Sequence, residues 1–386
     1  MQNVYVSSAC RTPIGKIAGS LSEINDVKLI SLAMRELIKR SDIDVNDISE
    51  VYVGCCFPEE QYNLGRKAVI QAGLPYHIPA STINKTCCSS LEALVQGVRE
   101  IQAGDADYVL VGGVENMSRS PHVMKNAIKK ARMLAKGEFI NFEDVHGNLI
   151  DDIGVAVELS AKKYGYSKKQ QDRVAYESHR KARIAQESGK FIAEIFEVVI
   201  PGSNEKFVKD ETINYDINLE EMEKENPLFI KGGTITVSNT SPINDGAAAL
   251  LLVSEKEVKN RGISVMARIT ANACVGVNPD EMIFAPAYAI QKLLAEKKMK
   301  LQDIDLIECS EAYAAQVIGT KSILQWEDQK VNVNGGSIAL GHPLGCSGLR
   351  MCTTLVHTML RDNYSNGIVS MCAGGGMGQA VMFERS

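Results

Sequence analysis

The stretch CCSSLEALVQGVREIQAGDADYVLVGG, residues 87–113, contains the pattern that decides the fold. Apolar residues recur in it at the spacing of an amphipathic helix, namely Leu91, Leu94, Val95, Val98 and Ile101. Ser89 and Glu92 fit a capping box at the start of that helix. The apolar run YVLV then predicts a buried strand that ends at Gly112 and Gly113.

The same order of elements returns near the C-terminus, in GCSGLRMCTTLVHTMLRDNYSNGIVSMCAGGG, residues 345–376. A second pair precedes these two stretches. The strand VYVGCC (51–56) leads into the helix NLGRKAVIQAG (63–73), and the strand DLIECS (305–310) leads into AYAAQVIGTKSIL (312–324). Repeated strand–helix–strand units predict two similar α/β halves, although α/β chains also show this order without duplication.

The region between the repeats, residues 118–242, has a different composition. It is more polar and contains a basic segment at 125–136 and a long charged helix at 167–190. We interpret it as an inserted loop domain. The strand GAAALLLVS (246–254) and the helix after it then close the first half. The predicted organisation is an N-terminal half made of 1–117 plus 243–264, the insertion at 118–242, and a C-terminal half at 265–386.

Composition excludes several classes of protein. The chain has 386 residues, 45% of them hydrophobic, and a net charge of −5, which argues against nucleic acid or an anionic membrane surface as partner. Its apolar runs are shorter than the roughly 18 residues of a membrane span, and no secretory signal is visible. Ten cysteines occur without a CxxC pair or zinc-type Cys/His spacing. We therefore expect a reduced, cytoplasmic protein without a metal site.

Four segments should gather where strands end and helices begin, the usual place for ligands in α/β folds. They are Cys87-Cys88, SEAY (310–313), GGSIALGHPLGCSG (335–348) and CAGGG (372–376). A thiol at a helix N-terminus has a lowered pKa, a histidine such as His342 can accept its proton, and glycine amides can form an oxyanion hole. This combination suggests acyl transfer through a thioester.

Each of these signals also has a purely structural explanation. A cysteine before a helix can be a small buried residue, a histidine in a glycine-rich loop can be a hydrogen-bonded structural residue, and the glycines can serve a tight turn. The glycine runs match neither GxGxxG nor a Walker A sequence, so a nucleotide-binding fold has little support.

Six motifs taken together resemble the thiolase family along nearly the whole chain. They are SSACRTPIGKIAGSL (7–21), NKTCCSSLEAL (84–94), DYVLVGGVENMSRSPH (107–122), SNTSPINDGAAALLLVSE (238–255), NVNGGSIALGHPLGCSG (332–348) and CAGGGMG (372–378). The resemblance implies an α/β, five-layered fold of two similar βαβαβαββ halves with an inserted loop domain. It also implies an acyl-CoA acetyltransferase.

The resemblance assigns the catalytic residues. The family's nucleophile lies three residues after an asparagine, here Asn84, which selects Cys87. Cys88 stands where the family usually has glycine; helix physics alone does not separate the two thiols. His342 is implied to activate Cys87 and to line the first oxyanion hole, and Cys372 to act as acid and base. The amides of Cys87 and Gly374 are implied to form the second hole.

The resemblance also implies the reaction and the partners. Cys87 would take an acyl group from acyl-CoA, and Cys372 would deprotonate acetyl-CoA for a Claisen condensation; the reverse is thiolysis of a 3-ketoacyl-CoA. Residues implied to line the coenzyme A tunnel and acyl pocket are Ser241, Ala312, Tyr313 and Met282. No cofactor beyond coenzyme A is expected. Relatives are dimers or tetramers, with tetramer contacts near 120–150, and a homotetramer in fatty acid metabolism is the expectation.

Three further points stay open at this level. Ser310 replaces the family's usual asparagine or histidine, whose side chain holds a water in the first oxyanion hole; a hydroxyl can hold such a water. Asp152 stands where many acetoacetyl-type relatives have histidine. The basic residues Lys129, Lys130 and Arg132 can meet coenzyme A phosphates, or form a solvated helix face or subunit contact.

Two alternative functions compete with an active thiolase. One is a catalytically weak or silent acyl-CoA-binding homologue, suggested by Ser310 and Cys88. The other is a condensing enzyme of the ketoacyl-synthase type, in which a histidine stands where this chain has Cys372. The sequence gives neither the physiological direction nor the acyl chain length.

Overall fold

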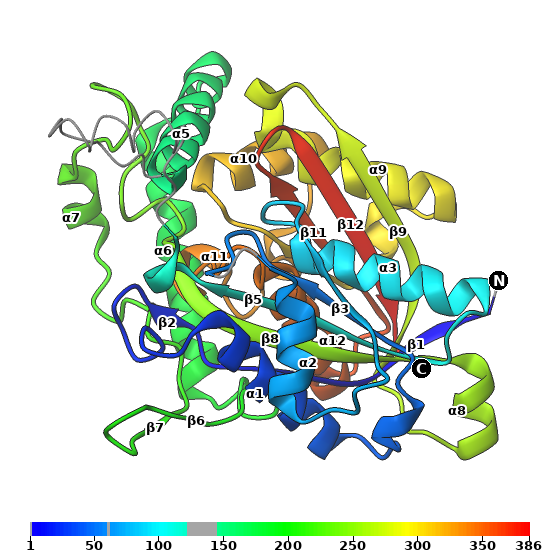
Figure 1. The fold of residues 1–386 in the computed structure, drawn as a ribbon. Helices are drawn as coiled ribbons and strands as arrows, with labels where there is room; N and C mark the ends of the chain where they lie inside the picture. Colours follow the sequence, from blue (N-terminus) through cyan, green and yellow to red (C-terminus); the bar gives the residue numbers. More distant parts are fainter. Residues whose placement is uncertain (1, 60–61, 122–144) are drawn as a thin grey trace, which may run out of the picture.

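The computed structural model describes residues 2–59, 62–121 and 145–386, with backbone only for 145–152. In this part of the chain, ten strands form one mixed sheet in the order β10-β11-β12-β9-β1-β8-β5-β3-β4, with β2 beside β8 (Figure 1). None of the described helices combines the length and the apolar character that a membrane span needs.

The first half contains the following elements: β1 (Val4–Arg11), β2 (Gly15–Lys16), α1 (Asp26–Arg40), β3 (Glu50–Gly54), α2 (Leu64–Ala72), β4 (Ala80–Ile83), α3 (Ser89–Ala103), β5 (Tyr108–Asn116), β8 (Asn244–Ser254) and α8 (Glu255–Arg261). The second half contains these: β9 (Ala267–Gly276), α9 (Ala285–Lys297), β10 (Leu306–Cys309), α10 (Ala314–Leu324), α11 (Ser337–Leu340), α12 (Ser347–Asp362), β11 (Asn366–Ala373) and β12 (Met377–Glu384).

The strand order is palindromic. Apart from the edge strand β4, it runs inward through β3, β5, β8 and β1 on one side, and from the other edge through β10, β11, β12 and β9. Directions agree as well: β3–β5 and β10–β11 are parallel, and the next two pairs in each half are antiparallel. The halves meet where β1 pairs with β9. The two similar halves predicted from the internal repeat are therefore present.

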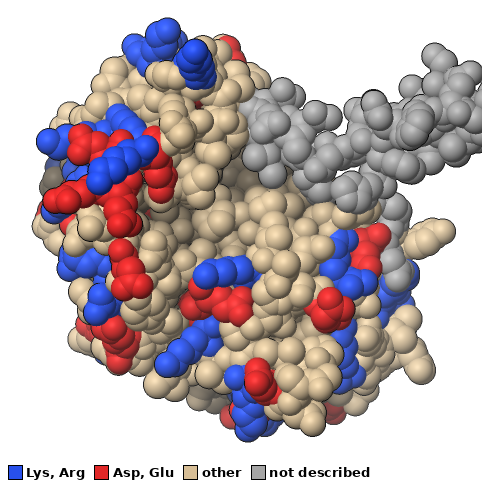
Figure 2. Space-filling view, turned by 90° about the vertical axis from the view of Figure 1, so that its left-hand side faces the viewer, with Lys and Arg blue, Asp and Glu red and all other residues tan. Residues whose placement is uncertain are grey.

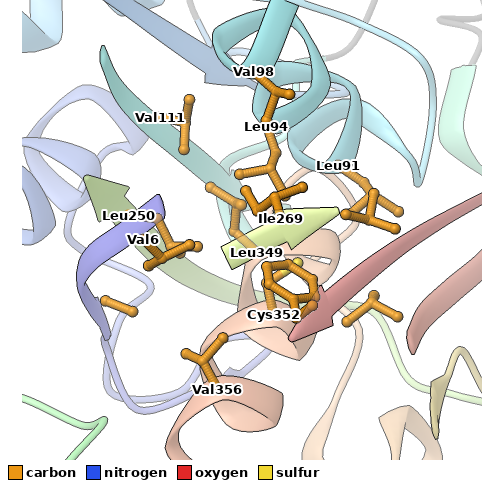
Figure 3. Close-up of a cluster of buried hydrophobic side chains, with 14 of the residues drawn as sticks. Val6, Leu91, Leu94, Val98, Val111, Leu250, Ile269, Leu349, Cys352 and Val356 are labelled. Carbon is orange, nitrogen blue, oxygen red and sulfur yellow. The ribbon is translucent and has the colours of Figure 1, made fainter. Parts of the chain in front are cut away.

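Side chains alternate between two apolar layers along the strands. In β5, Val109 and Val111 belong to the central core, whereas Leu110 belongs to the core under α1 and α2. The central core combines α3 and α12 with strands of both halves (Figure 3). A third core lies between α9 and the second-half strands. The resulting layers are the outer helices and the strands of the first half, the central helices α3 and α12, and then the strands and the outer helices of the second half. These are the predicted five layers.

One strand of the βαβαβαββ pattern is reduced in the second half. In the first half β4 pairs with β3 over four residues, but the corresponding chain forms a single parallel bridge, Ile307 with Val331. Asn332 then leaves the extended conformation with a φ of 45°. Its side chain accepts from the Cys309 N–H (2.8 Å) and donates to the Cys309 carbonyl (3.0 Å). A side chain thus replaces the missing strand pairing.

The segment between β5 and β8 lies to one side of the sheet, at the left of Figure 1. Its described elements are α5 (Val145–Tyr164), α6 (Lys168–Glu187), β6 (Val198–Val199), β7 (Lys206–Phe207) and α7 (Leu219–Lys224). The predicted charged helix corresponds to α6, which begins with a capping box of Ser167 and Gln170.

Candidate active site

The loop that carries Cys87 connects β4 to α3 and is fixed by its own side chains. Asn84 donates to the Cys56 carbonyl (2.8 Å) and accepts from the Thr86 N–H (3.0 Å). Thr86 has a φ of 50°, a conformation that costs a β-branched residue about 1–3 kcal/mol and that recurs at functional sites. The loop therefore holds Cys87 in a strained and defined position.

The predicted capping box at Ser89 is wrong in two ways: the helix begins one residue earlier than predicted, and the capping hydrogen bonds are absent. The N-cap of α3 is Cys88, and its side chain makes no capping hydrogen bond. The Ser89 hydroxyl accepts from the Lys85 N–H at 2.9 Å, and Glu92 pairs with the Lys85 ammonium at 2.6 Å. Both side chains thus bind the loop that precedes the helix, which further fixes the Cys87 turn.

Cys87 is half-buried beside the end of the second half's β11. The backbone N–H groups of Gly374 and of Cys87 itself lie close enough to its sulfur to favour the thiolate. Burial, together with the neighbouring Cys372, raises the pKa of the Cys87 thiol to about 12, although the two N–H groups lower it. The lowered pKa expected from the helix N-terminus is therefore wrong, because desolvation outweighs the helix effect. Cys87 is a neutral thiol that requires a base.

His342 lies in the buried loop between α11 and α12. Its backbone N–H points to the Pro242 carbonyl (3.1 Å) and the Asn244 side-chain oxygen (3.0 Å). It forms a backbone bridge with Ile243, which packs on the same cluster (Cys56, Met117, Leu344) as Cys87. The segment of His342 and the side chain of Cys87 are therefore connected through one apolar cluster.

The contacts of Ser347 are the basis for assigning the tautomer of His342. The Ser347 hydroxyl oxygen lies 2.9 Å from the Pro343 carbonyl and 2.6 Å from His342 Nδ1; we assign its hydrogen to the carbonyl, which places the ring proton on Nδ1. The second ring nitrogen, Nε2, then carries the lone pair. Burial, with Arg350 assisting, lowers the pKa of His342 to about 4. The ring is neutral near pH 7, and Nε2 can accept a proton.

Cys372 lies near the end of β11, almost fully buried. Its N–H donates to the Ser310 hydroxyl at 3.2 Å, and its sulfur is 3.7 Å from the same oxygen. Its carbonyl lies 3.7 Å from the Cys88 sulfur. Burial raises the pKa of the Cys372 thiol to about 11, and the Ser310 contact opposes that rise. The structure therefore brings together Cys87, Cys372, Gly374 and Ser310.

The residues predicted to bind coenzyme A also lie together. Ser241 bonds to the Ala312 carbonyl through its hydroxyl (3.0 Å) and its N–H (3.1 Å), and Thr240 forms a backbone bridge with Tyr313. Met282, in the 3₁₀ segment Pro279–Phe284, belongs to one buried cluster with Ala312, Tyr313 and Cys372. This cluster forms an apolar wall that leads to the second thiol.

The sequence analysis did not identify Glu115, which joins the two halves behind the site. Its buried carboxylate accepts from the N–H groups of Cys56 (2.9 Å), Phe57 (2.8 Å) and Gly345 (2.7 Å). Gly345 is three residues from His342, so Glu115 ties the His342 loop to the end of β3. A carboxylate at the end of an otherwise apolar strand is the signal that could have revealed it.

Several predictions concern residues outside the described part of the chain: Lys129, Lys130, Arg132, the Asp152 side chain and most of the contact segment 120–150. The side of the molecule that carries the insertion shows Lys and Arg interspersed with Asp and Glu (Figure 2). On α6, Arg173 and Arg180 pair with Glu177, and Arg183 pairs with Glu187. These three arginines are therefore already engaged by carboxylates.

Comparison with known families and proteins matches the whole chain. Residues 4–256 match the family described as "Thiolase, N-terminal domain" and residues 263–385 match "Thiolase, C-terminal domain". A "Probable acetyl-CoA acetyltransferase" of Escherichia coli is 40% identical, with all of both chains covered. An "Acetyl-CoA acetyltransferase" of Cupriavidus necator is 38% identical with the same coverage.

Solved structures agree with these matches. The Bacillus anthracis acetyl-CoA acetyltransferase superposes with a TM-score of 0.96 at 35% identity, covering 100% of this chain and 99% of that one. Human mitochondrial 3-ketoacyl-CoA thiolase superposes with a TM-score of 0.93 at 30% identity and the same coverage. The architecture and the sequence similarity extend over the same full length.

Proposed function

The chain belongs to the thiolase family and is an acyltransferase, and we propose that it joins acetyl-CoA to an acyl-CoA through an acyl-Cys87 intermediate. With two acetyl-CoA molecules the products are acetoacetyl-CoA and CoA, and the reverse reaction is thiolysis of a 3-ketoacyl-CoA. One observation supports the proposal: Cys87 and Cys372, from opposite halves, are close enough for the charge of one thiol to act on the other, and the Gly374 amide lies close enough to the sulfur of Cys87 to stabilise its thiolate.

In the first step Cys87 attacks the thioester carbonyl of an acyl-CoA. Nε2 of neutral His342 takes the Cys87 proton as the sulfur–carbon bond forms. The N–H groups of Cys87 and Gly374, which already converge on that sulfur, stabilise the oxyanion. The carbon–sulfur bond to CoA breaks and CoA leaves as a thiolate, which afterwards takes the proton of Cys372, so formation of acyl-Cys87 does not itself depend on Cys372. This leaves acyl-Cys87, a Cys372 thiolate and a protonated His342.

In the second step the Cys372 thiolate removes an α-proton from acetyl-CoA. The resulting carbanion attacks the carbonyl of acyl-Cys87 and forms the new carbon–carbon bond. Cys87 leaves as thiolate and takes its proton back from His342, while Cys372 ends as a thiol. Protons therefore balance over the cycle without any cofactor beyond the coenzyme A of the substrates.

The finer features of function are also proposals. Ser241, Ala312 and Tyr313 are assigned to the pantetheine tunnel and Met282 to the acyl pocket, because they share one cluster with Cys372 or contact it. Ten unpaired thiols suit a reducing, cytoplasmic setting. A homo-oligomer, dimer or tetramer, and a role in fatty acid metabolism rest on the family. Thiolysis rates of acetoacetyl-CoA against longer 3-ketoacyl-CoA substrates will distinguish a short from a long acyl preference.

The proposed function predicts a covalent adduct. After incubation with acetyl-CoA, we expect peptide mass spectrometry to find an acetyl group on the Cys87 peptide and none in Cys87→Ala. Cys372→Ala should form the adduct but no acetoacetyl-CoA. Cys274→Ala, which changes an exposed thiol, serves as the matched control and should behave as the parent. An unmodified Cys87 peptide together with retained coenzyme A binding would instead support the silent acyl-CoA binder.

A further inference from the structure

The hydroxyl of Ser310 is placed differently from a water anchor. It follows β10 directly and contacts the second thiol itself, with Oγ 3.7 Å from the Cys372 sulfur and 3.2 Å from the Cys372 nitrogen. A third neighbour, the side-chain oxygen of Gln316, lies 3.4 Å away. Ser310 and Gln316 are both buried, so these contacts are not shared with bulk water.

The orientation of the Gln316 amide is fixed from both ends. Its oxygen accepts from the Ala312 N–H (3.3 Å). Its nitrogen donates to the Thr320 hydroxyl oxygen (3.1 Å), whose own hydrogen goes to the Ile283 carbonyl (3.2 Å). Gln316 therefore presents an acceptor to Ser310 rather than a donor.

These contacts limit the hydrogen bonds that the Ser310 hydroxyl can make. Its oxygen accepts from the Cys372 N–H, and its single hydrogen has two possible acceptors, the Gln316 oxygen and the Cys372 sulfur. When Cys372 is a thiol, the hydrogen belongs on the Gln316 oxygen. When Cys372 is a thiolate, a rotation about the Cβ–Oγ bond gives that hydrogen to the sulfur, because a charged acceptor is the stronger one.

We propose that Ser310 is a catalytic residue that stabilises the Cys372 thiolate by direct hydrogen bonding, and that Gln316 is the positioning residue that holds the hydroxyl between turnovers. This inference rests on the proposed role of Cys372 as acid and base. It differs from the water-anchor role, because the hydroxyl donates its hydrogen to a protein acceptor and accepts from the Cys372 N–H, rather than binding a water.

The surroundings of Cys372 include groups that oppose a thiolate. Three thiols, namely Cys87, Cys88 and Cys309, interact with it electrostatically. Thiols that ionise would oppose a second negative charge. A neutral hydrogen-bond donor is therefore the group that can favour the Cys372 thiolate without adding charge.

The test measures the two half-reactions separately in the full-length enzyme. Exchange of the acetyl hydrogens of acetyl-CoA for deuterium in D₂O reports on Cys372, and acetyl-Cys87 formation reports on the first step. We expect Ser310→Ala to slow exchange about tenfold near pH 7 and to move its pH profile upward by about one pH unit, because a hydrogen bond to a charged group is lost. We expect acetyl-Cys87 formation to change by less than about twofold.

Two further variants complete the design. Ser310→Thr keeps the hydroxyl and should retain the parental pH profile. Ser370→Ala removes a buried hydroxyl from the same strand as Cys372, where it bonds only to the carbonyls of Pro286 and Gln379, and should leave both half-reactions as in the parent.

Three results would overturn the inference: an unchanged exchange profile in Ser310→Ala, an equal loss in both half-reactions, or a Ser310→Asn variant as active as the parent while Ser310→Thr is not. The last would return Ser310 to the water-anchor role. Absence of acetyl-Cys87 in the parent would overturn the proposed function as well, which separates the two failures.

Discussion

At the residue scale, Cys87 and His342 have opposite pKa shifts with one physical cause. Removal from water disfavours the charged form of each group, so it raises the pKa of the thiol to about 12 and lowers that of the imidazole to about 4. The resting pair is therefore neutral. In the proposed mechanism, proton transfer becomes favourable when an acyl group arrives, because the negative charge moves from the sulfur to an oxyanion that the nearby N–H groups of Cys87 and Gly374 stabilise.

The pKa of His342 predicts a pH-dependent contribution to stability. Unfolding returns this pKa from about 4 to its ordinary value of 6.5, so between these values the unfolded chain binds more protons. This group's contribution to the free energy of unfolding is complete above pH 6.5 and is lost as the pH falls toward 4. We expect the stability deficit of His342→Asn to shrink by about 3 kcal/mol between pH 7.5 and pH 4, measured by urea unfolding.

His179 offers a matched control for this measurement. Burial lowers its pKa to about 4 as well, but its ring accepts from the Asn214 N–H on the insertion rather than facing the site. His179→Asn should therefore show the same pH signature in stability and retain acetyl-Cys87 formation, whereas His342→Asn should lose it. A deficit of His342→Asn that is constant with pH would contradict the lowered pKa.

The identity of the site could be read from the sequence only in part. Cys87, His342 and Cys372 follow from motif register, but the neutral state of Cys87 does not, because desolvation depends on what packs around it. Glu115 stands out in the sequence only as a carboxylate at the end of an apolar strand, and Ser347 has no distinguishing signal. Their roles depend on which backbone groups the fold places within hydrogen-bond distance.

At the scale of elements, α3 and α12 approach each other closely at their N-termini. A Cβ added to Gly348 would lie 2.8 Å from the Leu91 nitrogen and 3.0 Å from the Ser90 hydroxyl oxygen. The Leu349 N–H donates to that same hydroxyl at 3.1 Å. This contact sets the spacing between the loop of Cys87 and the loop of His342, because each loop leads directly into one of the two helices.

Gly348→Ala is expected to disturb this crossing. A backbone atom cannot move aside as a side-chain end can, so we expect a loss of about 1–3 kcal/mol in unfolding free energy and a lower rate of Cys87 acetylation. Gly97→Ala in α3 is the matched control, since the three atoms nearest to its Cβ would be side-chain methyl groups of Leu252, Val109 and Val111 rather than backbone atoms. Chemical denaturation and the acetylation assay should separate the two, and equal effects would contradict this account.

The elements themselves were largely predictable, with one informative exception. Periodicity identified α3, α12 and the strands after them, because the two helices each have one apolar face and the two strands are apolar and buried along nearly their whole length. It did not reveal that the second half's third strand is reduced to a bridge at Val331. In that region the Asn332 side chain binds the Cys309 backbone in place of strand pairing. This contact joins residues far apart in the sequence, so no local sequence pattern predicts it.

At the scale of the whole molecule, Arg11 links three parts of the chain. It starts from β1, pairs with Glu194 (2.7 Å) and Asp210 (2.8 Å) of the insertion, and is fully buried. Glu194 also accepts from the Thr354 hydroxyl of α12 at 3.0 Å. Both halves and the insertion are thus joined by one buried ionic network.

Removal of Arg11 should therefore be severe. Arg11→Met leaves two buried carboxylates without their cation, and we expect a loss of about 3–5 kcal/mol in unfolding free energy, measured by chemical denaturation. Arg261→Met is the matched control, because Arg261 is half-exposed where it pairs with Asp47 and Glu257. Its loss should stay below about 1 kcal/mol. Similar losses for the two variants would show that the buried network does not join the parts.

The palindromic strand order has a consequence for how many reaction centres the molecule holds. Each half starts its central helix after a cysteine, Cys88 before α3 and Cys346 before α12. Both cysteines are fully buried, and the halves differ one residue earlier: the first half has the half-buried thiol of Cys87 there, whereas the second half has Gly345, whose N–H donates to Glu115 of the first half. A scaffold with two similar halves therefore has a single proposed reaction centre. The first half occupies the corresponding place in the second half with Glu115, and the second half contributes the Cys372 thiol and the Gly374 amide to the centre at Cys87.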